Sequence, residues 1–141
     1  MTAQDPTRVL FVCTANAARS QMAEGLLRAR GGEAYAVHSA GSAPTEVHPL
    51  AIEAMAELDI PLDGHRSEPL KAYREEVFDY VITLCDGTRD VSPSIRAKEM
   101  VIHRPFDDPD GYPSDEQPDA FRRVRDEIAN WIEQLFLLQT A

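Results

Sequence analysis

Residues 9–24 read Val-Leu-Phe-Val-Cys-Thr-Ala-Asn-Ala-Ala-Arg-Ser-Gln-Met-Ala-Glu, an apolar run that becomes a helical pattern after a short turn. The run predicts a buried strand that ends at Cys13. A helix that begins near Ser20 directs free N–H groups and the positive end of its dipole toward the turn, where they favour a bound anion. The same field, together with the Arg19 guanidinium, favours the thiolate form of Cys13. This stretch therefore predicts a cysteine nucleophile inside an oxyanion-binding loop.

The same residues also have a purely structural interpretation. A buried cysteine is commonly a small core residue, and Arg19 and Ser20 could simply open a surface helix. A strand, a turn and a helix in this order are, however, the context that a phosphate-binding loop requires. We therefore favour the functional interpretation.

Apolar runs and helical patterns alternate along the chain. Strands are predicted at residues 8–13, 35–39, 78–84 and 100–103, and helices from residue 20 and at 51–58, 68–76 and 121–135. The alternation predicts an α/β fold, a single-domain three-layer sandwich in which a four-stranded parallel sheet is flanked by helices on both faces. Ligands bind beyond the carboxyl ends of such strands, and Cys13 stands at one of these ends.

Composition limits the classes of function. The 141 residues, 43% hydrophobic and 27% charged, suit one domain over 1–141. A formal net charge of −10 argues against nucleic acid or an anionic membrane as a partner. The chain lacks the patterns of a membrane span and of a signal peptide, so we expect a cytoplasmic protein, and we expect it to be a monomer.

Metal-binding spacing is absent from the sequence. The chain has two cysteines without a CxxC pair, so we expect no metal site and no bound cofactor. Its histidines show no ligand spacing either, and we assign loop or sheet-edge positions to all of them: His38, His48, His65 and His103.

Several further motifs follow in order at residues 13–25, 38–41, 49–55, 81–85, 106–109 and 121–128. In this order they resemble the low-molecular-weight tyrosine phosphatase superfamily over nearly the whole chain. Phosphatases of that superfamily usually show Ser-Pro after the loop arginine. The Ser20-Gln21 pair, and Cys85 after Val-Ile-Thr-Leu, resemble instead its arsenate reductase branch.

The resemblance implies a role for each residue of the loop. Cys13 would be the nucleophile, Arg19 would clamp a tetrahedral oxyanion in bidentate fashion, and the Ser20 hydroxyl would donate to the Cys13 sulfur. Asn16 would fix a left-handed turn, which asparagine tolerates well. The oxyanion would lie among the peptide groups of one continuous segment: Cys13, Thr14, Ala15, Asn16, Ala17, Ala18 and Arg19.

Two further residues carry roles implied by the resemblance. Asp108 would protonate the departing oxygen, although residues 107–111 could also be a simple acidic turn and Asp107 competes for the same role. Cys85 would attack Cys13 and release arsenite, although it could also be a small residue packed at a strand end. We expect the two cysteines to end neighbouring strands and to meet after a modest loop movement; a disulfide would need Cα atoms within about 7 Å.

The chain also departs from its relatives. Thioredoxin-coupled reductases have a third cysteine where Ser92 stands, and Ala15, Ala17 and Ala18 replace other common loop residues. The external reductant therefore stays open between thioredoxin and a low-molecular-weight thiol with a glutaredoxin-like partner.

The chain also departs from its relatives at the position where some of them bind a cation. Some relatives hold potassium beside the loop with residues that match Asn16, Glu24 and Ser39, but Arg66 and Glu68 stand at two other positions. We predict that the Arg66 cation substitutes for the metal and balances Glu24 or Glu68. An Arg66 that points to solvent would instead be a surface charge.

These observations lead to three functional hypotheses. The first is a cytoplasmic arsenate reductase that acts through Cys13, Arg19, Ser20, Asp108 and Cys85. The alternative is a low-molecular-weight protein tyrosine phosphatase that hydrolyses aryl phosphates with the same loop. The third is an oxyanion-binding regulatory protein that has lost turnover through its alanine substitutions.

Overall fold

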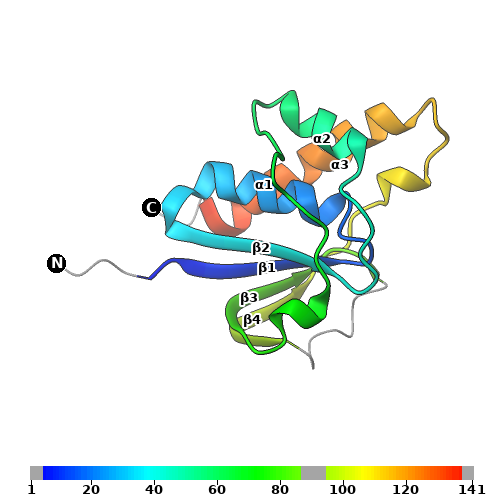
Figure 1. Cartoon of the computed structure of the whole chain (residues 1–141). Coiled ribbons are helices and arrows are strands. Elements are labelled where there is room, and N and C mark those ends of the chain that lie inside the picture. The colour runs from blue at the N-terminus through cyan, green and yellow to red at the C-terminus, as the bar shows by residue number, and fades with distance from the viewer. Residues whose placement is uncertain (1–4, 87–94, 138–141) are drawn as a thin grey trace.

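The computed structural model describes residues 5–86 and 95–137. Within these residues a four-stranded parallel sheet has the order β2-β1-β3-β4 (Figure 1), formed by β1 (Thr7–Cys13), β2 (Tyr35–Gly41), β3 (Val77–Thr83) and β4 (Arg96–His103). The predicted parallel sheet is confirmed. β4 begins earlier than predicted because this edge strand opens with exposed polar residues that lack an apolar pattern.

Three α-helices cover one face of the sheet (Figure 1): α1 (Arg19–Gly31), α2 (Pro49–Ala56) and α3 (Gln117–Ile132), which continues as a π-helical turn, η5 (Glu133–Leu137). The opposite face carries the short 3₁₀ helix η2 (Leu70–Tyr73). A longer helix was predicted at 68–76, but Pro69 caps a segment of only four helical residues. Two more 3₁₀ helices complete the described elements: η1 (Gly32–Ala34) and η4 (Pro109–Gly111).

The alternating side chains of β1 build the core on both faces of the sheet. Val9 and Phe11 belong to the cluster under the α-helices, whereas Leu10 and Val12 belong to the cluster on the η2 side. All four are fully buried. A parallel strand that is covered on both faces needs a continuous apolar run rather than an alternating one, which explains the stretch before Cys13.

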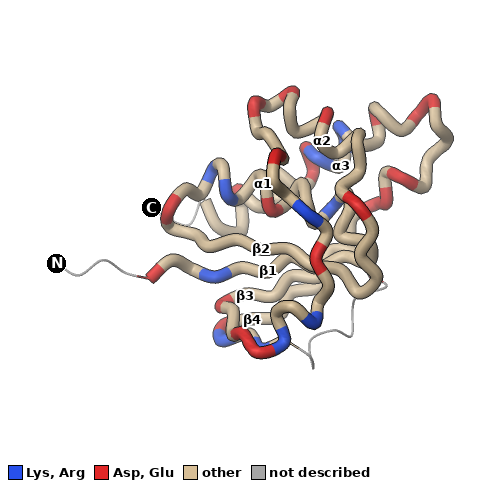
Figure 2. Tube along the Cα trace, viewed as in Figure 1, with Lys and Arg blue, Asp and Glu red and all other residues tan. Residues whose placement is uncertain are grey.

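The carboxyl ends of the strands meet at one edge of the sheet, where Cys13 pairs with Gly41 in register. Acidic and basic residues spread over the helices, loops and sheet edges rather than gathering in one cluster (Figure 2). No described helix is long and apolar enough to cross a membrane.

Gly41 lets the turn after β1 approach the end of β2. A Cβ atom at this position would lie 2.5 Å from the Thr14 carbonyl oxygen and 3.0 Å from the Asn16 nitrogen. Because both contacts are with backbone, we expect Gly41→Ala to lower the free energy of unfolding by about 2 kcal/mol. Gly111→Ala is the matched control: its Cβ would meet no atom within 4 Å, and we expect a change below about 0.5 kcal/mol. Urea unfolding measures both variants, and equal losses would contradict the steric explanation.

Candidate active site

The turn between β1 and α1 is held from outside by the segment that follows β2. The backbone N–H groups of Ala43, Thr45 and His48 donate to the carbonyl oxygens of Thr14, Ala15 and Ala17 at 2.8–3.0 Å. These bonds fix the orientation of successive peptide groups in the turn. A fixed array of peptide dipoles is what an anion-binding loop needs.

Asn16 holds the same turn from beneath. Its φ of 50° confirms the predicted left-handed conformation, and its side chain is fully buried. The Asn16 Nδ2 atom donates to Ser20 Oγ at 2.8 Å and to Ser39 Oγ at 2.9 Å, while Oδ1 accepts from the Glu68 N–H at 2.8 Å. The side chain was predicted both to line the oxyanion site and to support it, and its contacts are those of a support.

Ser20 contacts Cys13 by a different route from the one predicted. Its backbone N–H donates to the Cys13 sulfur, and its hydroxyl accepts the bond from Asn16. The first turn of a helix has free N–H groups, so the backbone can supply the donor that was expected from the side chain.

Arg19 lies beside Cys13 with part of its hydrogen-bonding capacity unused. Its Nη1 donates to the Phe106 carbonyl at 3.0 Å and its Nη2 lies 3.8 Å from Asp108 Oδ2. Among the described residues, Arg19 Nε is a buried side-chain nitrogen without a hydrogen-bond partner. A buried donor left unpaired is costly, so this atom is available to an acceptor such as the oxygen of an oxyanion.

A cavity of about 340 Å³ opens over the turn. It is large enough for a tetrahedral oxyanion and the attached group. Its lining confirms that most of the predicted loop residues come together, and it includes three residues from outside the loop: Cys13, Thr14, Ala15, Ala17, Ala18, Arg19, His48, Asp108 and Asp110.

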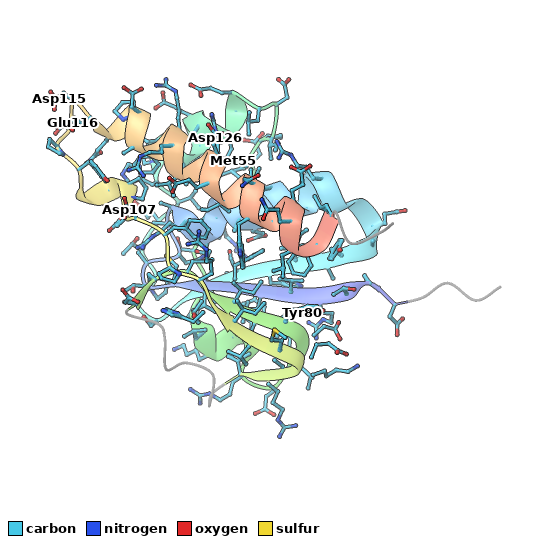
Figure 3. All side chains as sticks on the ribbon, turned by 180° about the vertical axis from the view of Figure 1, so that it is seen from behind. Met55, Tyr80, Asp107, Asp115, Glu116 and Asp126 are labelled. Carbon is cyan, nitrogen blue, oxygen red and sulfur yellow. The ribbon has the colours of Figure 1, made fainter. Side chains whose placement is uncertain are left out.

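The two candidate acids are distinguished by their contacts. Asp107, labelled in Figure 3, accepts from the Tyr112 hydroxyl at 3.0 Å and from Arg123 Nη1 at 3.4 Å, so its carboxylate is engaged away from the cavity lining. Asp108 lines the cavity, faces Arg19 and has a side chain that is 53% exposed. The geometry therefore favours Asp108 over Asp107 as a proton donor.

Of the predicted role of Arg66, the structure shows the pair with Glu68 but neither a pair with Glu24 nor a buried cation. Its side chain is 81% exposed and lies 3.7 Å from Glu68, at the surface. Glu24 instead accepts from Ser39 Oγ at 2.5 Å and pairs with Arg28 Nη2 at 2.6 Å. Arg28 follows Glu24 by one helical turn, and this i,i+4 spacing is the sequence signal that could have identified it.

His65 is the second group beside Glu24, at 4.0 Å from its carboxylate. Its Nδ1 lies 3.0 Å from Gln21 Oε1. Burial lowers the pKa of His65 although Glu24 opposes the shift, so the neutral ring is favoured and Arg28 is the cation that balances Glu24. Within the described part of the chain, no group of acidic, histidine and cysteine side chains has the arrangement of a metal site.

Cys85 is already in contact with the loop, so the predicted loop movement is unnecessary. Its sulfur lies 3.3 Å from Thr14 Oγ1 and forms a hydrogen bond with the Cys13 thiol. Both cysteines are buried thiols that are not joined in a disulfide. The topology explains the contact, because β1 and β3 are neighbours and both thiols follow the carboxyl ends of these strands.

The second thiol changes the ionisation of the first. The hydrogen bond to Cys85 and then burial raise the pKa of Cys13, whereas Arg19 and the Ser20 N–H lower it, and the net direction is upward. The sequence predicted the influences of Arg19 and the helix, which lower this pKa, but not those of Cys85 and burial, which raise it. Two thiols in contact cannot both ionise easily. The observed pKa values therefore describe the pair rather than either cysteine alone.

Comparison with known proteins shows the family. Residues 8–140 match the family described as low molecular weight phosphotyrosine protein phosphatase. The chain belongs to this family. The resemblance that the order of motifs predicted is therefore confirmed, and the parallel sheet with its loop at the end of β1 is the fold of this phosphatase family.

Individual relatives within this phosphatase family are arsenate reductases by name. The chain is 41% identical to "Arsenate reductase 2" of Staphylococcus saprophyticus over 94% of this chain and 98% of that protein. It is 35% identical to "Glutaredoxin arsenate reductase" of Synechocystis sp. over 91% and 95% of the two chains. The solved structure "An arsenate reductase in the phosphate binding state" superimposes with a TM-score of 0.81 at 33% identity, over 94% of this chain and 98% of that one.

One residue at this site of the phosphatase fold was missed by sequence reasoning. His48 was assigned a plain loop position, but it lines the cavity and its ring nitrogen caps α2 by accepting the Leu50 N–H at 3.0 Å. The sequence signal for this cap is that His48 directly precedes Pro49. Proline favours the first helical position, so the residue before it is the cap. Ser92, which stands where a third cysteine was expected, lies outside the described residues.

Substitution of Asn16 separates the contribution of its side-chain hydrogen bonds from that of its left-handed backbone conformation. Asn16→Gly keeps the left-handed conformation available but leaves Ser20, Ser39 and the Glu68 N–H without their shared partner, so we expect a loss of about 3 kcal/mol in the free energy of unfolding. Asn16→Ala loses the same bonds and adds a left-handed penalty of about 1 kcal/mol. Denaturant unfolding compares the two, and an alanine variant as stable as the glycine variant would show that the turn relaxes.

Substitution of Cys85 tests the ionisation balance. Cys85→Ala removes the largest influence that raises the pKa of Cys13, so the midpoint for alkylation of Cys13 by iodoacetamide should move to lower pH. Arg19→Gln removes a lowering influence and should move it to higher pH. Peptide mass spectrometry follows the Cys13 rate at each pH. A shift to higher pH in Cys85→Ala would contradict this balance.

Proposed function

We propose that this protein reduces arsenate to arsenite with electrons from an external thiol. The observation that carries the proposal is the contact between two buried thiols at the oxyanion-binding loop, Cys13 and Cys85. Hydrolysis of a phosphate ester by Cys13 needs no second thiol, whereas reduction does. The names of the relatives, which cover nearly the whole chain, support the same activity.

In the first step the loop would bind arsenate and Cys13 would attack it. Arg19, with its unpaired Nε, and the peptide groups of the turn would hold the oxyanion. The Cys13 thiolate forms a sulfur–arsenic bond while one arsenic–oxygen bond breaks. The departing oxygen takes a proton from Asp108 and leaves as water. While Cys85 keeps its own proton, Arg19 and the Ser20 N–H favour the charge on Cys13.

In the second step Cys85 would resolve the adduct. Its sulfur attacks the Cys13 sulfur, a disulfide forms, and the electron pair of the sulfur–arsenic bond passes to arsenic, while the proton that Cys85 gives up goes to the departing arsenite. Arsenic is reduced from the +5 to the +3 state and leaves as arsenite, while the two thiols are oxidised. The contact that already exists between the two thiols supports this step without a large rearrangement.

An external thiol would then restore both cysteines. The proposal includes thioredoxin, or a low-molecular-weight thiol with a glutaredoxin-like protein, as the reductant. The name of the Synechocystis relative supports the second of these. A reducing compartment such as the cytoplasm suits a protein that works through reduced thiols.

Hydrolysis of aryl phosphates is the second candidate activity. The family description and the complete set of Cys13, Arg19 and Asp108 support it. A protein that only binds oxyanions is less well supported, because the nucleophile, the clamp and the acid all line the same cavity.

A cysteine comparison tests the proposal. Cys85→Ser should lower arsenate reduction more than about a hundredfold but change 4-nitrophenyl phosphate hydrolysis less than about threefold, because only reduction needs the second thiol. Cys13→Ser should abolish both. Arsenite release is measured with thioredoxin and, separately, with glutathione and glutaredoxin. Equal survival of both activities in Cys85→Ser would exclude the reductase mechanism.

A further inference from the structure

His48 connects three parts of the site that are far apart in the sequence. Its backbone N–H donates to the Ala17 carbonyl of the loop at 2.9 Å, and its Nδ1 accepts the Leu50 N–H at the start of α2. Its Nε2 lies 3.1 Å from Asp110 Oδ1, on the segment that carries Asp108. Among the described residues that line the cavity, His48 stands out because it bonds to all three segments.

The direction of these bonds assigns the protons on the ring. Because Nδ1 accepts the Leu50 N–H, the proton of the neutral ring lies on Nε2 and is donated to the Asp110 carboxylate. The ring is held in this orientation by the fully buried Phe121, whose centroid lies 4.7 Å away. His48 is thus a fixed donor rather than a mobile side chain.

Asp110 in turn determines the direction of the Asp108 carboxyl group. The Asp110 N–H donates to Asp108 Oδ1 at 3.0 Å, and the Gly111 N–H donates to the Asp108 carbonyl at 3.1 Å. Gln117 Nε2 also donates to the Asp110 carbonyl at 3.2 Å. A residue that holds Asp110 therefore also holds the peptide N–H that binds the Asp108 carboxylate.

The segment has a second anchor, but it serves Asp107. Arg123 Nη2 donates to the Tyr112 hydroxyl at 2.7 Å, and both residues bind Asp107. The anchors therefore divide the segment: Tyr112 and Arg123 engage Asp107, whereas His48 holds the Asp110 side chain and Gln117 holds the Asp110 carbonyl.

We propose that His48 is a positioning residue, which through Asp110 fixes the Asp108 carboxyl group over the oxyanion-binding loop. This rests on the proposed function, in which Asp108 donates the proton to the departing oxygen. The Asp110 side chain is 57% exposed, so its bond to His48 contributes orientation rather than much stability. A small displacement of a proton donor lowers the rate of the chemical step without changing the affinity for the anion.

His48→Asn and Asp110→Ala test this role. Asparagine still caps α2 but is too short to reach Asp110, and Asp110→Ala removes the acceptor while keeping the N–H that binds Asp108. Each should lower the maximal rate of arsenite release about fivefold in a single turnover of the reduced enzyme, with unchanged inhibition by inorganic phosphate. The double variant should be no slower than either single one. Asp115→Ala is the control, because Asp115 lies at the outer end of the loop before α3 (Figure 3).

An Asp108→Asn background decides whether His48 acts through Asp108. In that background His48→Asn should cause no further loss, because the acid that it positions is already gone. A further loss there, or weaker inhibition by phosphate in His48→Asn, would show that His48 contacts the substrate directly and would overturn the proposal.

A readout independent of arsenate separates this proposal from the proposed function. Hydrogen exchange of the Asp110 and Gly111 N–H groups should become at least about fivefold faster in His48→Asn, since both donate to Asp108. Exchange as slow as in the wild type would overturn the positioning role. A wild type that fails to reduce arsenate would overturn the proposed function. The exchange measurement would still test whether His48 positions Asp108.

Discussion

The buried side chain of Asn16 is the interaction on which the rest of the site depends. It bonds to α1 through Ser20, to β2 through Ser39, and to the segment before η2 through Glu68, and the two serines are buried. With the outer bonds from residues 43–48, it fixes the turn after β1 in a conformation that most residues avoid. The loop is therefore organised by the fold rather than by the ligand, which is the condition for electrostatic preorganisation.

An anion site in a chain of net charge −10 requires local compensation. Arg19 supplies the positive charge at the cavity, and the peptide groups of the turn add fixed dipoles. On the other side of Asn16 and Ser39, the buried Glu24 is balanced by Arg28 from the same helix, so its charge does not oppose the loop. The net charge of the molecule thus has little influence on the site, because short-range contacts dominate at these distances.

The contact between Cys13 and Cys85 connects the fold to the chemistry. Neighbouring parallel strands bring two thiols to the same edge of the sheet, and the second thiol opposes ionisation of the first. In the proposed cycle this opposition disappears once Cys13 is bonded to arsenic, because Cys13 then carries no proton to share. The same proximity that restrains the resting pair would make the resolving attack short in distance.

The residue pattern was enough to predict the alternation of strands and helices, the parallel sheet, and the strand–turn–helix segment with Cys13, Asn16 and Arg19. These follow from local hydrophobic periodicity and from the conformational preferences of single residues, which act over a few positions. The three-dimensional contacts were needed to distinguish the surroundings of Asp107 from those of Asp108, to pair Glu24 with Arg28 rather than Arg66, and to place His48 at the cavity. These outcomes depend on where side chains point and on contacts between segments that are distant along the chain. The i,i+4 spacing of Glu24 and Arg28 and the place of His48 before Pro49 are local signals, but neither shows which side chain faces the cavity and which faces solvent.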